Sequence, residues 1–339
     1  MHRALIIALA VGVLLSFAAE NVFATHVGCG DLVTTDVRLD SDLVGCPGPG
    51  LVVGADDITI DLRGHTIAGA DLAGAGVDDT GQHDRLVIEN GTITGFYDGV
   101  FLKQSSGSAV RRLEISHVFQ GVELLDSPEN AVERNSISDA TSGGISVEGE
   151  SDRNRVEKNS VSRAGAGVQL SPAVQPTRTP DDNLIVKNEL APGGIGVAFG
   201  GTALRNRVER NVFHDNATGV FALDADGNVI ERNDVIRGGL GMILIDSDDN
   251  RLSRNRVEEL FLGILVLDGS QSTILERNAA SRNQDDGIKV LAASTTLTGN
   301  VANDNGDLGI DAVPGVIDGG GNRASGNGNP AQCVNVACR

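Results

Sequence analysis

Short alternations of apolar and polar residues run along almost the whole chain, each broken by Gly, Asn, Asp or Ser. After a recurring Gly, apolar side chains fall one and three residues later, as at Val122 and Leu124 and again at Ile264 and Val266. A period of two with β-branched residues is typical of a strand that buries one face. No segment of helical length with a 3.6-residue apolar period follows the first two dozen residues. The pattern therefore predicts an all-β chain.

These strands recur with a spacing of about 22 residues. A Gly followed by Val, Ile or Met stands at Gly76, Gly99, Gly121, Gly144, Gly167, Gly196, Gly219, Gly241, Gly263, Gly287 and Gly309. Successive gaps are 22 to 24 residues, except for one gap of 29 that holds the Pro-rich stretch 171–182. A repeat of this length with two or three short strands is typical of one coil of a parallel β-helix. Roughly twelve coils stacked ~4.8 Å apart predict a rod of ~58 Å.

A hexapeptide keeps the same spacing. NRVERN at 206–211 returns as NRVEKN at 154–159 and as NVIERN at 228–233. The Asn that closes the motif stands at Asn135, Asn159, Asn188, Asn211, Asn233, Asn255, Asn278 and Asn300. We expect these residues to stack into a column in which each amide bonds to the next Asn and to the turn backbone. The motif is therefore interpreted as architectural.

Together with ITIDLRGHTI at 58–67, the repeat resembles the right-handed parallel β-helix superfamily, which includes pectate lyase-like enzymes and NosD-type periplasmic proteins. The resemblance covers about residues 50–325 and implies a right-handed parallel β-helix. It leaves two kinds of function open, because one fold hosts many activities. One is an exported protein that binds or processes an extracellular polysaccharide, with a lyase-like activity if it is an enzyme. The other is a non-catalytic NosD-like accessory or surface interaction protein.

The two ends of the chain fall outside the repeat. Arg3, an apolar run and small residues up to Ala24 are typical of a secretory signal peptide over 1–24. The repeats are expected over 51–313, with caps at 25–50 and 314–339. The prediction is a secreted or periplasmic protein without a membrane span.

Each predicted cap contains two of the four cysteines. We expect Cys29 to pair with Cys46 and Cys333 with Cys338, because an exported chain forms disulfides and a rod holds its two ends too far apart for a bond between them.

The net charge of −19 restricts the kinds of molecule that the protein can bind. It argues against nucleic acid and anionic lipid. Cations, neutral polymers, or an anionic polymer bridged by a divalent ion remain open. A column of Arg and Lys accompanies the Asn column, but Glu stands beside it, so it is interpreted as a solvated face with cross-strand pairs.

A row of Asp residues is the main candidate metal site. Asp224, Asp246 and Asp268 each stand five residues after the repeat Gly in consecutive coils, and Asp248 stands two residues after Asp246. Stacked carboxylates repel one another unless they are protonated, solvated or bridged by a cation, and oxygen ligands suit calcium. The alternative is a row of Asx turns.

Other candidate chemistry is sparse. Asp285 and Asp286 in NQDDGIKV echo the paired Asp of galacturonan hydrolases, but no Gly-His-Gly or Arg-Ile-Lys motif follows. A cleft for neutral sugars usually offers several aromatic platforms, whereas this chain has no Trp and one Tyr. The stretch Phe96-Tyr97-Asp98 is the one candidate aromatic patch.

One stretch of the outward strand face turns apolar. If residues one and three after the Gly point inward, the outward residues are Phe221 and Leu223, Ile243 and Ile245, and Leu265 and Leu267. An apolar patch of several hundred Å² is rarely left bare on a monomer. We expect another part of the chain, a second copy or a protein partner to cover it.

Overall fold

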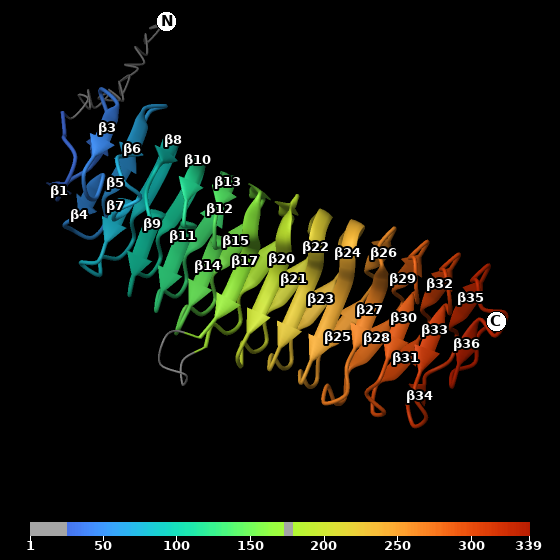
Figure 1. Cartoon of the computed structure of the whole chain (residues 1–339). Coiled ribbons are helices and arrows are strands. Elements are labelled where there is room, and N and C mark those ends of the chain that lie inside the picture. The colour runs from blue at the N-terminus through green and yellow to red at the C-terminus, as the bar shows by residue number, and fades with distance from the viewer. Residues whose placement is uncertain (1–25, 173–178) are drawn as a thin grey trace, which may run out of the picture.

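The computed structural model describes residues 26–172 and 179–339, and within them it contains 36 strands and no helix. Successive turns of the chain stack into an elongated rod with the two ends far apart (Figure 1). The predicted all-β parallel solenoid is confirmed. The predicted signal peptide at 1–24 lies outside the described residues.

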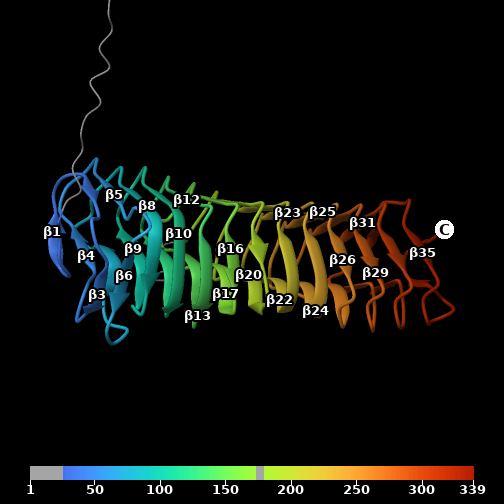
Figure 2. The ribbon, with the colours of Figure 1, turned by 90° about the horizontal axis from the view of Figure 1, so that it is seen from above.

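Each turn contributes strands to three parallel sheets that run along the rod (Figure 2). The first sheet stacks β1 (Asp31–Val33), β4 (Leu51–Val53), β7 (Ala75–Asp79), β9 (Asp98–Lys103), β11 (Gln120–Leu125), β14 (Gly143–Glu148), β17 (Ala164–Ser171), β20 (Gly193–Gly200), β22 (Val212–Leu223), β24 (Asp234–Ile245), β27 (Leu262–Val266), β30 (Ile288–Val290), β33 (Ile310–Ala312) and β36 (Cys333–Val334).

The second sheet stacks β2 (Val37–Arg38), β5 (Thr59–Asp61), β8 (Val87–Thr94), β10 (Ala109–Val118), β12 (Ala131–Glu133), β15 (Arg155–Glu157), β18 (Leu184–Val186), β21 (Arg207–Glu209), β23 (Val229–Glu231), β25 (Arg251–Ser253), β28 (Ile274–Glu276), β31 (Thr296–Thr298) and β34 (Ile317–Asp318).

The third sheet stacks β3 (Leu43–Cys46), β6 (Thr66–Gly69), β13 (Ser136–Ala140), β16 (Ser160–Ser162), β19 (Glu189–Leu190), β26 (Arg256–Glu258), β29 (Ala279–Ser281), β32 (Val301–Asn303) and β35 (Arg323–Ser325). The long strands β8 and β10 continue into it from the second sheet, and β22 and β24 continue from it into the first.

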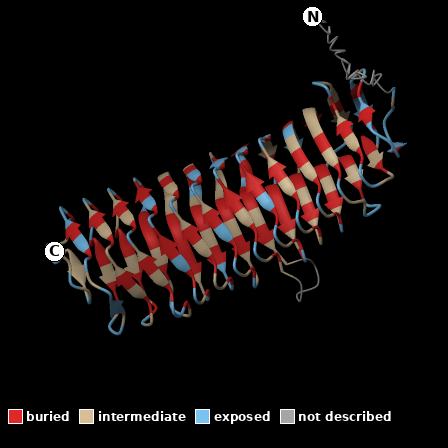
Figure 3. Cartoon of the chain, turned by 180° about the vertical axis from the view of Figure 1, so that it is seen from behind, coloured by how far each residue is buried: buried red, intermediate tan, exposed pale blue. Residues whose placement is uncertain are grey.

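The core is a set of apolar columns inside the coil. In the first sheet Val122 pairs with Ile145, and Ile145 pairs with Val168, and all three side chains are fully buried. Buried residues alternate with less buried ones along the strands over the whole length of the rod (Figure 3). This close stacking explains why Gly recurs in each turn. A Cβ atom at Gly121 would lie 2.3 Å from the carbonyl oxygen of Gly144 in the next turn.

The predicted Asn column is confirmed as a buried ladder. The Asn233 amide donates to Val208 O at 2.8 Å and to Asn255 Oδ1 at 3.1 Å, and its own Oδ1 accepts from the Asn211 backbone N at 2.9 Å. The opening Asn of the motif forms a second ladder, which contains Asn130, Asn154, Asn183, Asn206, Asn228 and Asn250. Both Asn positions of the motif therefore hold neighbouring turns together.

The two predicted disulfides are confirmed, with Cα–Cα distances of 5.3 Å for Cys29–Cys46 and 6.2 Å for Cys333–Cys338. The segments predicted to be caps also contribute strands, since β1 pairs with β4 and β36 pairs with β33 in parallel register. At each end of the solenoid, one further turn therefore covers strand edges that would otherwise be exposed. Across the described residues, no helix could cross a membrane.

Candidate functional site: an acidic cluster on the outward face

Side chains on the outward face of the first sheet line up in columns, because the parallel register places equivalent positions of each turn side by side. One column contains Asp78, Phe101, Glu123, Ser146, Gln169, Ala198, Phe221, Ile243, Leu265, Lys289 and Asp311. Apart from Phe101, the column is therefore acidic and polar over β7 to β14, and it is apolar over β22 to β27 and charged again at β30 and β33.

Three carboxyl side chains gather on the polar part of this face. Asp98 begins β9, Glu123 lies in β11 and Glu148 ends β14, so three consecutive turns supply them. Asp98 is buried, whereas Glu123 and Glu148 are half-buried. We name these three residues the acidic cluster.

Hydrogen bonds fix the orientation of Glu123 within the cluster. Gln120 Nε2 donates to Glu123 Oε2 at 2.8 Å, and Ser146 Oγ donates to Gln120 Oε1. The absent side chain at Gly143 leaves room for this chain of bonds, because a Cβ atom there would lie 2.4 Å from Ser146 Oγ. The remaining side of the Glu123 carboxyl hydrogen-bonds to the carboxyl of Asp98.

Two facing carboxyl groups form a hydrogen bond only when one of them holds a proton. Burial, which disfavours charge, raises the pKa of Asp98 to about 7. Burial together with the charges of Asp98 and Glu148 raises the pKa of Glu123 to about 8. Burial also raises the pKa of Glu148. All three shifts act in the same direction, so the folded protein favours protonation within the cluster at a higher pH than ordinary carboxyl groups do.

An aromatic pair borders the acidic cluster. The rings of Tyr97 and Phe119 stack with centroids 4.6 Å apart, and Tyr97 is 45% exposed. In the sequence, Tyr97 directly precedes Asp98, and Phe119 directly precedes Gln120. Burial and then the charges of the three carboxyl groups raise the pKa of Tyr97, so its hydroxyl lies within their field. The arrangement offers an aromatic surface beside a proton donor and a proton acceptor.

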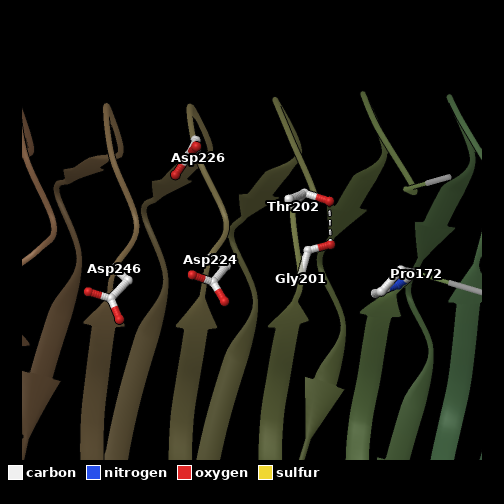
Figure 4. A pocket seen from close by; sticks show the side chains of 6 residues that line it. All are labelled: Pro172, Gly201, Thr202, Asp224, Asp226 and Asp246. Carbon is white, nitrogen blue, oxygen red and sulfur yellow. Dashed lines mark hydrogen bonds between the residues drawn. The ribbon is translucent and has the colours of Figure 1, made fainter. Parts of the chain in front are cut away.

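The predicted Asp row lies elsewhere, at the turn that follows the first sheet. Asp224 and Asp246 point into a surface hollow of about 350 Å³ that Pro172, Gly201, Thr202 and Asp226 also line (Figure 4). Asp224 and Asp246 adopt φ angles of 51° and 46°. Such left-handed backbone suits Asp in a turn.

The remaining members of the row bond to the turn backbone. Asp248 Oδ1 accepts from Gln271 N at 2.5 Å, and Asp268 Oδ1 accepts from Gly269 N at 3.1 Å. Backbone N–H groups of the next coil and of the same turn thus already engage the carboxylates of Asp248 and Asp268. Calcium at the Asp row stays a prediction.

The predicted apolar residues lie on the outward face of the first sheet. Phe221, Ile243 and Leu265 are in register in consecutive turns. The residues that flank Ile243 along its strand, Met242 and Leu244, point the other way and are buried in the core. Ile243 is 6% exposed because its two neighbours flank it, and Leu223 is 37% exposed. Ile245 and Leu267 are half-buried.

Asp285 and Asp286 lie at the far end of the same face. Their carboxyl oxygens lie within 4.8 Å of one another and of one from Asp307. Lys289 Nζ contacts both Asp286 Oδ2 and Asp311 Oδ2 at 2.8 Å, and Asp286 Oδ1 accepts from Leu308 N at 2.9 Å. These contacts give the buried Asp286 a structural role at the turn.

Sequence reasoning identified Tyr97 and Asp98 but missed Glu123, Glu148 and Gln120. A signal was present, because Glu123 and Glu148 occupy outward positions two and four residues after a repeat Gly. Nothing in the sequence showed that Asp98, which begins its strand, lies against Glu123 of the next turn.

Two family models match parts of the chain. One, described as periplasmic copper-binding protein (NosD), matches residues 62–220, and one described as a right-handed β-helix region matches residues 177–302. No match was found among curated proteins.

Solved structures share the fold at low sequence identity. A mannuronic acid-specific polysaccharide family 6 lyase from human gut microbiota has a TM-score of 0.59 and 13% identity, over 88% of this chain and 82% of that one. The family 6 alginate lyase AlyGC has a TM-score of 0.61 and 13% identity, over 92% of this chain and half of its own. The periplasmic alginate epimerase AlgG double mutant has a TM-score of 0.55 and 13% identity, over 90% and 80%.

Copper does not fit the side chains that the structure describes. Across 26–172 and 179–339, the one group of three or more His, Cys, Asp or Glu side chains with clustered ligand atoms is Asp285, Asp286 and Asp307. All four cysteines are in disulfides. Copper prefers imidazole and sulfur ligands, so an all-carboxylate group is a poor match.

Proposed function

This chain belongs to the right-handed parallel β-helix superfamily, and on that premise we propose that it is an exported protein that binds a polysaccharide along the outward face of its first sheet. One observation carries the proposal: an exposed aromatic ring stands beside a proton-sharing carboxyl pair on that face. The three similar structures named above, described as acting on alginate or mannuronic acid, support a polysaccharide as the ligand class. The two disulfides are typical of an oxidising compartment, which supports export.

Asp98 and Glu123 are also residue types that act as general acid and general base in catalysis. Hydrolysis or elimination at a glycosidic bond needs one group that gives a proton and one that takes a proton. Asp98 and Glu123 together supply both near neutral pH, because their pKa values are raised to about 7 and about 8. Processing of the bound polymer is therefore part of the proposal, with these two side chains as the acid–base pair.

A panel of neutral, acidic and amino polysaccharides tests binding and processing together. We expect one class to bind, and Tyr97→Ala to weaken that binding about tenfold through loss of ring stacking. Tyr97→Phe, which keeps the ring, should bind like the wild type. Phe261→Ala is a matched control, since Phe261 is also an exposed aromatic residue. Equal binding by Tyr97→Ala and the wild type would contradict the proposed surface.

A second candidate is a non-catalytic interaction protein, and the apolar part of the same face favours it. Phe221, Ile243 and Leu265 form a continuous outward apolar strip over three turns. Changing Ile243 and Leu265 together to Ser should then dissociate an oligomer without lowering the melting temperature. A lower melting temperature in a protein that is monomeric throughout would instead show that the strip packs within the chain.

A further inference from the structure

Residues with left-handed backbone at the corners of the coil stack into columns along the rod. At two corners the column mixes acidic and basic residues, so that an Arg contacts the acid of the preceding turn. These contacts join Arg85 to Asp57, Arg153 to Glu129, Arg205 to Asp182, Arg163 to Asp139, Arg237 to Asp215 and Arg282 to Glu259. Opposite charges in neighbouring strands stabilise a sheet, whereas like charges destabilise it.

The corner that follows the second sheet is different, because it carries one cation per turn over eight consecutive turns. We name this set the basic column. It contains Arg112, Arg134, Lys158, Lys187, Arg210, Arg232, Arg254 and Arg277, all exposed and with φ angles of 53° to 57°. Asn90 and Gly299 occupy the same corner in the turns on either side. Left-handed backbone favours Gly and Asn, so the corner itself does not require a cation.

The predicted cross-strand pairs with Glu are present, but they do not balance the basic column. Lys158 and Lys187 share Glu157, whose side chain is 9% exposed, whereas both Lys side chains are 46% exposed. Among the residues that the structure describes, Arg134 and Arg254 form an ion pair with none. The layer of this corner that faces solvent is therefore mainly cationic.

Few anions lie on the other side of the basic column. Two residues after each cation, at the start of the third sheet, three of the eight turns carry an acid, namely Glu114, Glu189 and Asp234. Salt screens charges beyond about 8 Å at physiological ionic strength, so a molecule at this corner responds mainly to these nearby side chains and less to the net charge of the protein. Eight like charges spaced ~4.8 Å apart repel one another, and a bound polyanion relieves that repulsion.

The geometry of the column selects among polyanions. The cations lie in single file along the elongated rod, so a ligand must keep its anionic groups in line at a spacing close to that of the turns (Figure 1). A nucleic acid strand carries a phosphate every ~3.4 Å and winds about its axis, so its phosphates leave the line. In an extended acidic polysaccharide each sugar is about as long as one turn is thick, so its anionic groups meet the column at every turn or every second turn. Arg guanidinium groups donate paired N–H bonds to such oxyanions.

We propose that the basic column binds an acidic polysaccharide whose chain runs along the rod and whose carboxylate or sulfate groups contact the Arg and Lys side chains. This surface lies between the second and third sheets, away from Tyr97 and the outward face of the first sheet. The inference therefore goes beyond the proposed function and does not rest on it.

Fluorescence anisotropy with labelled oligomers of about ten sugars, long enough to span the column, tests the inference. The probes are polymannuronate, a sulfated galactan, the same galactan without sulfate, and oligothymidylate of similar length. We expect one or both acidic glycans to bind, with an affinity that falls at least about tenfold between about 50 and about 200 mM NaCl. The two acidic probes distinguish carboxylate from sulfate as the preferred group.

A triple variant locates the binding surface. Arg210→Gln/Arg232→Gln/Arg254→Gln should weaken binding of the acidic glycan at least about tenfold and flatten its salt dependence. The corresponding Arg→Lys triple variant keeps the charge and should retain most of the affinity. Both should keep the wild-type melting temperature within a few degrees, because exposed ion pairs contribute little to stability.

The matched control removes the same charge from a corner of mixed sign. Arg163→Gln/Arg237→Gln/Arg282→Gln should change the affinity less than about twofold, because these cations already face acids of the preceding turn.

Four outcomes would overturn the inference. They are no binding of either acidic glycan at about 50 mM NaCl, equal weakening by the two Gln triple variants, equal or tighter binding of oligothymidylate, and equal binding of the unsulfated galactan. Tyr97→Ala separates this inference from the proposed function. If Tyr97→Ala weakens binding and the column variant does not, the proposed surface stands and the basic column falls, whereas the reverse result supports the basic column alone.

Discussion

The carboxyl groups of Asp98 and Glu123 come from adjacent turns of the solenoid and hydrogen-bond to each other on its outward face. A hydrogen bond between two carboxyl groups requires a proton that carboxylates ordinarily lose well below neutral pH. The stack makes this possible, because it brings the start of β9 beside β11, buries Asp98 and shields Glu123 in part from bulk water. This relationship produces measurable consequences for stability as well as for binding.

Stability should depend on pH through Glu123. Its pKa is raised from 4.5 in the unfolded chain to about 8 in the folded protein, so the folded state holds the proton more tightly. The free energy of unfolding therefore falls as pH rises between those values. Gln at position 123 carries no such proton, so the melting temperature of Glu123→Gln relative to wild type should increase from about pH 5 to about pH 9.

The matched control for that experiment is Glu114→Gln, at an exposed position of β10. Its melting temperature relative to wild type should show no comparable rise over the same range. A flat difference for Glu123→Gln would mean that Glu123 titrates as an ordinary surface carboxyl.

Removing one rung of the Asn ladder should destabilise the protein. Asn233→Ala deletes the amide that bonds to Val208 O and Asn255 Oδ1 and leaves Asn211 without its acceptor. Because these groups are buried, we expect a loss of about 1–3 kcal/mol in the free energy of unfolding, measured by urea denaturation.

Asn303→Ala provides the comparison for the ladder. Asn303 is half-buried, and its side chain bonds to Ser325 at an exposed position, where water can replace it. We expect a loss well below that of Asn233→Ala. Similar losses for the two variants would argue against a special role of the ladder.

The Asp residues at the hollow of Figure 4 can be tested as turn residues or as calcium ligands. Asn tolerates left-handed backbone, so Asp224→Asn and Asp246→Asn should keep the wild-type melting temperature, whereas Asp246→Val should lose about 1–2 kcal/mol. A rise in melting temperature with added calcium, present in wild type and absent from the Asp224→Asn/Asp246→Asn double variant, would show that the Asp row binds the metal.

The two disulfides should differ in their contribution to stability. Cys29–Cys46 spans 17 residues and Cys333–Cys338 spans 5. Loop closure in the unfolded chain then predicts losses of about 3 and about 2 kcal/mol when each pair is changed to Ala. Denaturation of the two double variants measures this order, and a larger loss at the C-terminal pair would contradict the loop-closure explanation.

The sequence by itself determined the period, the strands and the Asn columns. Each follows from local rules repeated along the chain: apolar residues one and three after Gly121 must face one side of a strand, and a residue such as Asn233 recurs at the same place in every turn. The pairing of the cysteines also followed, because Cys29 and Cys338 lie at opposite ends of a rod. A repeat multiplies a weak local signal, which is why these features could be predicted.

Only the tertiary structure decided where the chemistry lies. Asp98 starts a strand, and Glu123 is 25 residues later in the sequence, one turn along with a three-residue offset, so no local pattern joins them. Their interaction depends on side-chain direction, on burial and on the lack of an ion pair with any described Lys, Arg or His, and these are properties of the stacked surface. Asp224 and Asp246 were visible in the sequence because they share a register position. Asp98 and Glu123 do not, and the contact between unlike positions of neighbouring turns arises only when the coil closes.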